Sequence, residues 1–306
     1  MSVLAVTKKD FKGARRSKTL WAAAVLLGLI AVLLGFTARG YRLSATETVQ
    51  NQFRMLTQLL SVLLPLIALA VTYMAIAGER EGGGIKFLLS TPNTRRDVFV
   101  GKLLSRLGIV AAGVVFVYIA AVSISLTKHG VFPAGVILGT LLLTIVYGSV
   151  FVSIAVAVSA AAATRSRAIG SSLTSYFVLV ILYVFPLIGV KSLARGVHTA
   201  VLGMDPNPDL YNAVQYTSPF LAYRKSINLV VPDGLEQRLF RDSFANADRG
   251  AATGADTVGG AGPGAGHVDP DLPLYLTDEF SLVILAFWLV VPLLVGYWAF
   301  NRADLE

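Results

Sequence analysis

Long runs without a charged side chain constrain this sequence more than any other feature. Six stretches contain no Asp, Glu, Lys or Arg and are each 17 residues or longer, close to the length a helix needs to cross about 30 Å of hydrocarbon. They are residues 20–36, 59–77, 107–126, 136–163, 169–190 and 280–300. With 55% hydrophobic and 14% charged residues, the composition is not that of a soluble globular enzyme. The pattern predicts an all-α membrane protein with six transmembrane helices.

The first apolar stretch follows a basic segment, so a cleavable signal peptide is an alternative interpretation. The six cations that precede it are Lys8, Lys9, Lys12, Arg15, Arg16 and Lys18. This basic segment is long for a signal peptide, and residues 37–40 (Thr-Ala-Arg-Gly) form a poor cleavage site. We therefore expect a retained helix after an N-terminal amphipathic segment whose cations orient the chain and contact lipid headgroups.

The distribution of Lys and Arg predicts which ends face the cytoplasm. If the N-terminus is inside, fifteen of the 26 Lys and Arg residues lie on the cytoplasmic side, four lie in short outer loops, and seven lie in residues 191–279. Long outer segments carry little weight in the positive-inside rule, so both termini are expected in the cytoplasm. The net charge of +8 then follows from topology, and no nucleic-acid partner is needed to explain it.

Three sections of the chain differ in composition and expected location. Residues 1–190 hold the N-terminal amphipathic segment and the first five transmembrane helices, and residues 280–306 hold the sixth with a short cytoplasmic tail. Residues 191–279 form an extracytoplasmic segment that is too long for a plain connection. Four elements are predicted in it, in chain order: a strand at 227–231, a turn, an amphipathic helix at 235–244, and a disordered Gly/Ala/Asp-rich linker at 246–270.

Motifs for catalysis, metal binding and nucleotide binding are missing from the sequence. It lacks GxSxG, HExxH and a GxxxxGK-Ser/Thr loop, and it contains no cysteine. The three histidines, His129, His198 and His267, are far apart and have no carboxylate at ligand spacing, so surface positions are the simpler interpretation. The sequence therefore indicates no enzyme, and no catalytic, cofactor-binding or metal-binding residue is assigned.

The last four predicted spans contain no ionisable side chain. Ion-coupled transporters usually place such groups at membrane depth, because these groups bind or relay the driving ion, so a self-powered antiporter is disfavoured. The polar residues that remain are mostly Ser, Thr and Tyr, for which helix packing and hydrogen bonds to helix carbonyls are the simplest roles. Uncharged spans with hydroxyls and aromatic rings suit a lipid-like or amphipathic cargo better than a bare ion.

The loop between the second and third predicted spans contains a short amphipathic helix. Ile85, Leu88 and Leu89 recur at helical spacing and form an apolar stripe. Pro92 then ends the helix, because proline lacks the amide hydrogen that a helix interior requires. The spacing predicts a short helix on the cytoplasmic membrane surface, joined to two spans.

The flanks of this helix are charged. Thr94 and Asp97 have capping-box spacing, so a second helix is expected to begin near Thr94 and to continue into the third span. Adsorption to lipid is an alternative role for the loop and would explain the pair at 95–96 (Arg-Arg). It does not explain Glu79 and Glu81, since anionic lipid would repel both carboxylates.

Residues 78–106 resemble the loop between the second and third spans of ABC-2 type permeases, the exporter class of ATP-binding cassette transporters. The family pattern is Glu-Arg-Glu, Gly, a short apolar helix ending Leu-Leu-Ser-x-Pro, an Arg, and Gly-Lys at the entry to the next span. The matching residues are Glu79, Arg80, Glu81, Gly82, Leu88, Leu89, Ser90, Pro92, Arg95, Gly101 and Lys102. Residues 83–86 are Gly-Gly-Ile-Lys where the family more often has Gly-Thr-Leu-Glu, which alters the electrostatics of the partner contact.

The sequence carries two further resemblances to this family. Residues 218–223 (Ser-Pro-Phe-Leu-Ala-Tyr) look like the outer motif that precedes the sixth span in this family. Residues 93–97 and 300–305 are similar to haloarchaeal members of the family.

The resemblance implies a permease subunit that moves a substrate outward across the cell membrane. ATP would be bound and hydrolysed by a separate ABC ATPase subunit, and two permeases, identical or related, would form a dimer of half-transporters surrounded by membrane lipid. The apolar residues of the loop would bind in a groove of the ATPase, with charged residues at the rim. The residues assigned to ATPase coupling are Glu79, Arg80, Glu81, Gly82, Ile85, Leu88, Leu89, Pro92, Arg95, Arg96, Asp97, Gly101 and Lys102. A non-transporting membrane scaffold and a passive channel are the alternative functions.

Overall fold

The computed structural model describes residues 3–15, 18–37, 44–82, 94–185, 189–231 and 277–302, and every regular element in these ranges is a helix. Five of its helical runs are long and apolar enough to cross a membrane. They are Ala45–Glu81, Arg95–His129, Ala134–Ala161, Arg165–Val184 and Phe280–Arg302. The prediction of an all-helical, multi-pass membrane protein is confirmed.

The described helices are divided as follows. They are α1 (Val3–Arg15), α2 (Lys18–Thr37), α3 (Ala45–Thr72), α4 (Ala77–Glu81), α6 (Arg95–Ile124), η1 (Ser125–His129), α7 (Ala134–Ala161), α8 (Arg165–Tyr176), η2 (Phe177–Ile181), α9 (Leu182–Val184), α10 (Val190–Gly196), η4 (Val197–Val201), α11 (Pro208–Tyr216), α12 (Pro219–Asn228) and α14 (Phe280–Arg302). The first predicted span corresponds to α2, whose apolar part, Trp21–Phe36, is shorter than the five runs above. The count of six spans therefore stays a prediction.

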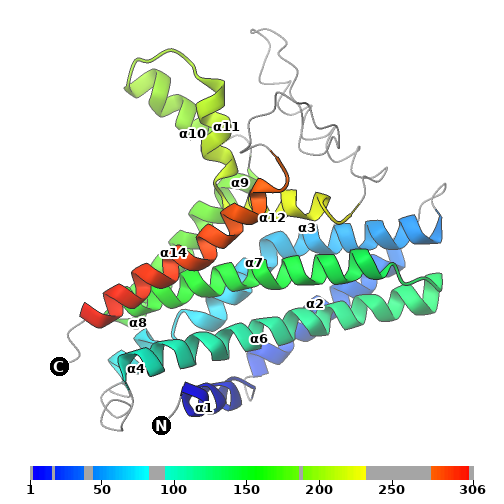
Figure 1. Cartoon of the computed structure of the whole chain (residues 1–306), viewed down its shortest axis with the longest axis horizontal. Helices are drawn as coiled ribbons and strands as arrows, with labels where there is room; N and C mark the ends of the chain where they lie inside the picture. Colours follow the sequence, from blue (N-terminus) through cyan, green and yellow to red (C-terminus); the bar gives the residue numbers. More distant parts are fainter. Residues whose placement is uncertain are drawn as a thin grey trace.

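Helix α7 is the centre of the bundle, because α3, α6 and α14 all pack against it. Figure 1 shows α3, α6 and α7 lying lengthwise beside one another, with α14 crossing them obliquely. The α7–α14 contact is very close, since a Cβ atom at Gly296 would lie 2.5 Å from the Cα atom of Ala157. Small residues at such contacts let two helix backbones approach, which is how transmembrane helices gain packing energy in lipid.

A proline inside α3 is accommodated by a neighbouring helix. Pro65 has no amide hydrogen, so the carbonyl of Ser61, four residues earlier, loses its helical partner. The hydroxyl of Tyr147 on α7 donates to that carbonyl at 2.6 Å, and both residues are buried. The ring of Tyr147 also stacks on Tyr223, with centroids 4.1 Å apart. A tyrosine therefore supplies the hydrogen bond that the proline removes.

The hydroxyls of the membrane helices mostly bond back to their own helices, as predicted. Ser149 donates to the carbonyl of Ile145 at 2.8 Å, and Thr174 donates to the carbonyl of Gly170 at 2.9 Å. A side-chain hydroxyl that bonds to the preceding turn carries no exposed donor, so it can face lipid at little cost.

Helix α12 is a short helix between the fifth and sixth predicted spans, and it is inserted into the bundle. It packs against α3, α7 and α14, and the side chains of Phe220 and Tyr223 are completely buried. The hydroxyl of Thr144 on α7 lies 2.8 Å from that of Tyr223 and 2.9 Å from that of Tyr118 on α6. Two residues after Tyr223, burial lowers the pKa of Lys225, and the nearby carboxylate of Asp278 opposes this shift.

The predicted strand at residues 227–231 is wrong. Ile227 and Asn228 are the last residues of α12, and the chain continues in a turn in which the amides of Leu229 and Val230 donate to carbonyls of the last helical turn. The guanidinium of Arg54 on α3 donates to the carbonyl of Val231 and so terminates the turn against the bundle. The predicted helix at 235–244 and the predicted linker at 246–270 lie outside the described residues.

The fifth predicted span ends earlier than expected. Its helix stops at Val184, and Phe185 has extended backbone angles, φ −101° and ψ 108°. The residue before a proline avoids the helical region because the proline ring clashes with it, and residue 186 is proline. Helices α10 and α11 then project sideways from the bundle beyond α9 (Figure 1).

Candidate functional site

The candidate site is the end of the bundle where α4 stops and α6 begins, around the segment singled out by the sequence. Residues 83–93 lie outside the described residues, and so do the predicted apolar anchors Ile85, Leu88 and Leu89 and the helix-ending Pro92. The two flanks of this segment, 79–82 and 94–102, are described. Their contacts show which other helices the two flanks are connected to.

The N-terminal turn of α6 forms as predicted. Thr94 is the N-cap residue: its Oγ1 accepts from the amide of Asp97 at 3.2 Å, and its own amide donates to Asp97 Oδ2 at 3.0 Å. These reciprocal bonds satisfy two amides that a helix start would otherwise leave without partners. The capping-box prediction is confirmed, and it fixes the start of α6 at Arg95.

A cluster of opposite charges around the buried Lys102 joins α1, α4 and α6. Lys102 on α6 is only 2% exposed, and its Nζ lies 2.8 Å from Glu79 Oε1 on α4 and 3.7 Å from Asp10 Oδ1 on α1. Arg106, one turn further along α6, lies 3.3 Å from the other oxygen of Asp10. The cluster contains two cations and two carboxylates, so its charges balance. Balance matters here because a buried charge without a partner is strongly destabilising.

Gly101 allows α1 to lie directly on α6. A Cβ atom at this position would lie 2.8 Å from the Cβ of Val6, which is closer than real Cβ contacts. The absence of a side chain lets Thr7 donate through Oγ1 to the carbonyl of Gly101 at 3.1 Å. The Gly-Lys pair of the sequence motif therefore packs inside the protein, with the glycine contacting α1 and the lysine joining α1 to α4.

Glu81, at the end of α4, holds the start of α8. One of its carboxylate oxygens accepts from the backbone amide of Arg165 at 2.6 Å, and the Arg165 guanidinium donates to the carbonyl of Gly78 at 3.3 Å. A carboxylate at a helix N-terminus is favourable because the unpaired amides there carry partial positive charge. The last residues of α4 are thus attached to α8, and the exposed Gly82 lies close to the same guanidinium.

Arg95, the first residue of α6, caps the end of α14. Its Nη1 donates to the carbonyls of Phe300 at 3.1 Å and Asn301 at 2.9 Å. These carbonyls belong to the last described turn of α14. The next residue, Arg96, is exposed, whereas Arg80 on α4 is partly buried.

Together these contacts connect the two flanks of segment 83–93 to four other parts of the bundle. We call this set the loop-flank junction; its members are Asp10, Glu79, Glu81, Arg95, Gly101, Lys102, Arg106 and Arg165. Through it α4 and α6 contact α1, α8 and α14, and the oxygen of Ser159 adds α7 by accepting from the amides of Ile76 and Ala77 at 3.0 Å each. Among the described residues no group of His, Cys, Asp or Glu is arranged to hold a metal ion. The contacts of the junction thus link α4 and α6 to α1, α7, α8 and α14.

Three members of the junction were missed by sequence reasoning: Asp10, Arg106 and Arg165. Asp10 did carry a signal, because it is the only acid among the six cations of the first eighteen residues. An acid at that position weakens lipid attraction and indicates a protein partner. Arg106 and Arg165 carried no signal beyond the positive-inside rule. The proposed contact of the segment with an ATPase stays a prediction.

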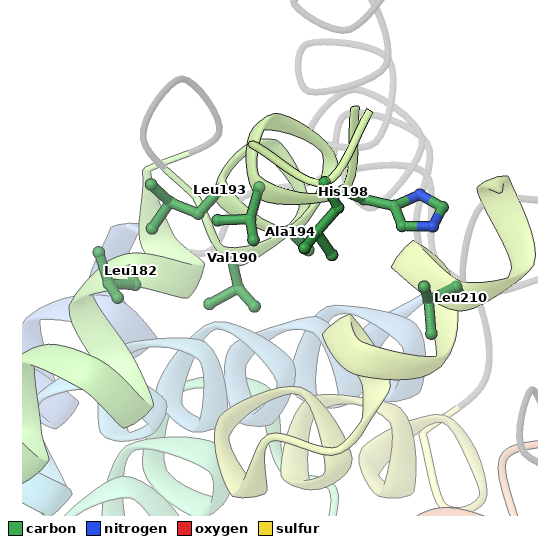
Figure 2. A pocket seen from close by; sticks show the side chains of 8 residues that line it. Leu182, Val190, Leu193, Ala194, His198 and Leu210 are labelled. Atoms are coloured by element: carbon green, nitrogen blue, oxygen red, sulfur yellow. The ribbon is translucent and has the colours of Figure 1, made fainter. Parts of the chain in front are cut away.

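An apolar groove lies elsewhere, between α9 and the projecting pair α10 and α11. It has a volume of about 460 Å³ and is lined by aliphatic side chains, including Leu182, Leu193 and Leu210 (Figure 2). His198 lies at its edge, and Nδ1 of this ring is 2.8 Å from the hydroxyl of Tyr211. A groove with so little polar lining offers no chemistry for a hydrophilic ligand.

Comparison with known proteins agrees with the character of the bundle. A family model described as "ABC-2 family transporter protein" matches residues 4–305. The chain is 30% identical over 199 residues to "Probable ABC transporter permease protein NosY" of Pseudomonas aeruginosa, covering 63% of this chain and 72% of that relative. It is 29% identical over 309 residues to the protein of the same name from Stutzerimonas stutzeri, covering 97% of both.

Proposed function

The chain belongs to the ABC-2 transporter family as a permease subunit of an ABC transporter, and we propose that it is one half of an exporter driven by a separate ATPase chain. In this proposal α2 is the first of six membrane spans, both termini are cytoplasmic, and the loop-flank junction lies at the cytoplasmic surface. The excess of Lys and Arg in the segments predicted to be cytoplasmic supports the orientation. The missing nucleotide-binding motif supports hydrolysis on another chain.

One observation carries the proposal: the flanks of segment 83–93 are attached to several helices at once. Glu79 and Lys102 join α4 to α6, Glu81 reaches α8, and Arg95 reaches α14. A partner that pushes on this segment would therefore move the ends of several membrane helices together. A scaffold that only recruits a cytosolic protein has no need of such connections, because its loop could be attached to a single helix.

The proposed transporter contains two permeases and two ATPase chains. Six spans form half of a channel in this family, so a second copy of this chain or a related permease would complete the path. The cargo is proposed to be lipid-like or amphipathic, since the predicted spans offer hydroxyls and aromatic rings and contain no Asp, Glu, Lys, Arg or His. An ion such as copper or sodium is the alternative by family analogy.

Copurification tests the proposal. Tagged permease is expressed with candidate ABC ATPases and purified in lipid nanodiscs, and we expect one ATPase to copurify in equal amount. Leu88→Asp should abolish copurification, because an apolar anchor at the centre of a contact typically contributes about 2 kcal/mol or more. Arg96→Ala, the matched control at the proposed rim, should retain it.

The other outcomes separate the alternatives. An absence of any ATPase in the nanodisc complex contradicts the exporter. A complex that binds ATPase but transports nothing into inverted vesicles supports the scaffold, and cargo that moves equally well with a hydrolysis-dead ATPase supports the passive channel. Normal binding and transport in Leu88→Asp would show that residues 79–102 are not the coupling element.

A further inference from the structure

Lys102 has two possible carboxylate partners, and they belong to different helices. Its ammonium lies 2.8 Å from Glu79 on α4 and 3.7 Å from Asp10 on α1. The first distance is that of a charge-assisted hydrogen bond, and the second is an ion pair without one. A shift of the ammonium by about 0.9 Å toward Asp10 would bring that carboxylate to the present Glu79 distance.

The surroundings of Lys102 make such an exchange inexpensive. Lys102 is 2% exposed, so withdrawing its partner without a replacement would leave a buried, unpaired charge, which typically destabilises by about 3–5 kcal/mol. Asp10 is already within ion-pair distance and can take over when Glu79 leaves. In the present arrangement Arg106 holds Asp10 at 3.3 Å, so Asp10 is also paired while Lys102 binds Glu79.

Three atoms of the cluster retain unused hydrogen-bonding capacity. Within the described part of the chain, Asp10 Oδ2, Glu79 Oε2 and Arg106 Nε are buried and have no hydrogen-bond partner. A fully satisfied buried network rigidifies a protein, and this cluster is not fully satisfied. Glu79 is also 36% exposed at its side chain, so water can receive it when α4 moves.

We propose that Lys102 is a positioning residue that exchanges Glu79 for Asp10 and thereby lets α4 separate from α6 and return. In the engaged arrangement Lys102 binds Glu79 and Arg106 binds Asp10. In the released arrangement Lys102 binds Asp10, and Glu79 moves away with α4 and the segment that follows it. The proposal rests on the proposed function only for its purpose, which is to let an ATPase displace the segment without exposing a buried charge.

Hydrogen exchange in the permease alone, without any ATPase, tests the exchange. The amides of Glu79, Arg80 and Gly82 donate to carbonyls within α4 and the turn before it, so their protection reports how often α4 opens. Asp10→Asn removes the alternative partner and should raise protection by about fivefold. Arg106→Gln leaves Asp10 to compete for Lys102 and should lower protection by about the same factor.

The decisive feature of the test is that Asp10→Asn and Arg106→Gln should change the protection of α4 in opposite directions. If the cluster only anchors α1, both substitutions loosen the same contact, both lower protection, and the proposal is overturned. Asp10→Glu keeps the carboxylate and should restore wild-type protection. Lys9→Gln, on the exposed side of α1, is the matched control and should change nothing.

A second measurement connects the exchange to the ATPase. In the purified complex, Asp10→Asn should retain the bound ATPase while permease-dependent ATP hydrolysis falls severalfold, because α4 releases less often. Loss of the ATPase from the wild-type complex would contradict the proposed function without affecting the exchange result. Unchanged protection in Asp10→Asn and Arg106→Gln would contradict the exchange without affecting the proposed function.

Discussion

Tyr147→Phe should destabilise the bundle because it removes a single hydrogen bond. The substitution keeps the ring that stacks on Tyr223 and removes only the hydroxyl that donates to the carbonyl of Ser61 at 2.6 Å. Pro65 has already deprived this carbonyl of its helical partner, and lipid supplies no replacement donor. Hydrogen bonds between membrane helices average below 1 kcal/mol and reach about 1.7 kcal/mol, so a loss of about 1 kcal/mol in unfolding free energy is expected.

A second substitution isolates the cause. Pro65→Ala restores an amide at position 65, which can donate to the carbonyl of Ser61 within α3. In the Pro65→Ala protein, Tyr147→Phe should lower the unfolding free energy by less than half of the amount by which it lowers it in the wild type. The assay is reversible unfolding in mixed micelles with increasing dodecyl sulfate, followed by circular dichroism, for the four proteins of the double-mutant cycle. An equal loss in both backgrounds would refute the link between the proline and the tyrosine.

Three further predictions concern helix contacts. Gly296→Ala should lower the unfolding free energy by about 1–3 kcal/mol, because the new methyl overlaps the backbone of α7. Gly113 has open space around it, so Gly113→Ala should be neutral or stabilising. The same unfolding assay checks both substitutions. Gly101→Ala should loosen α1 and raise its hydrogen exchange, whereas Gly108→Ala, whose methyl meets α1 at an ordinary 3.5 Å, should not. Arg95→Ala should increase exchange in the last turn of α14 by about tenfold, the ratio for roughly 1.4 kcal/mol, because two carbonyls lose their donor.

The membrane helices were predictable from sequence because their signal is local and physical. A run without charge must avoid water, so each of the five long runs was located. The charge-free windows gave the bounds of α7 and α14 to within two residues, but α3 begins 14 residues before the predicted span 59–77. The start of α6 was equally predictable, since Thr94 and Asp97 satisfy each other within one turn. The end of the fifth span was missed because the window count ignored the effect of proline on Phe185.

Elements that depend on tertiary contacts were not predictable in the same way. Ile227, Val230 and Val231 have strand-forming side chains, yet the bundle buries their neighbours as α12 and Arg54 on α3 terminates the turn. The burial of α12 within the bundle had no signal in its hydropathy, because a stretch of ten residues that includes Lys225 is too short and too polar to resemble a span.

The candidate site was likewise predictable only in part. The motif residues Glu79, Gly101 and Lys102 were identified from sequence, but the spacing could not indicate that they would pack beneath α1. Their partner Asp10 is more than 60 residues away from Glu79 in the chain, and only the fold brings the two to the same ammonium.

The central claim is that the segment beginning at Glu79 and ending at Lys102 receives the ATPase, and photocrosslinking tests it directly. Because the chain contains no cysteine, one introduced cysteine carries the only benzophenone label. Leu88→Cys puts the label in the proposed contact, and Thr127→Cys puts it on the exposed surface at the far end of the same α6 run. We predict an ATPase adduct from position 88 and none from position 127; adducts only from position 127, or from neither position in a complex that retains its ATPase, would contradict the claim.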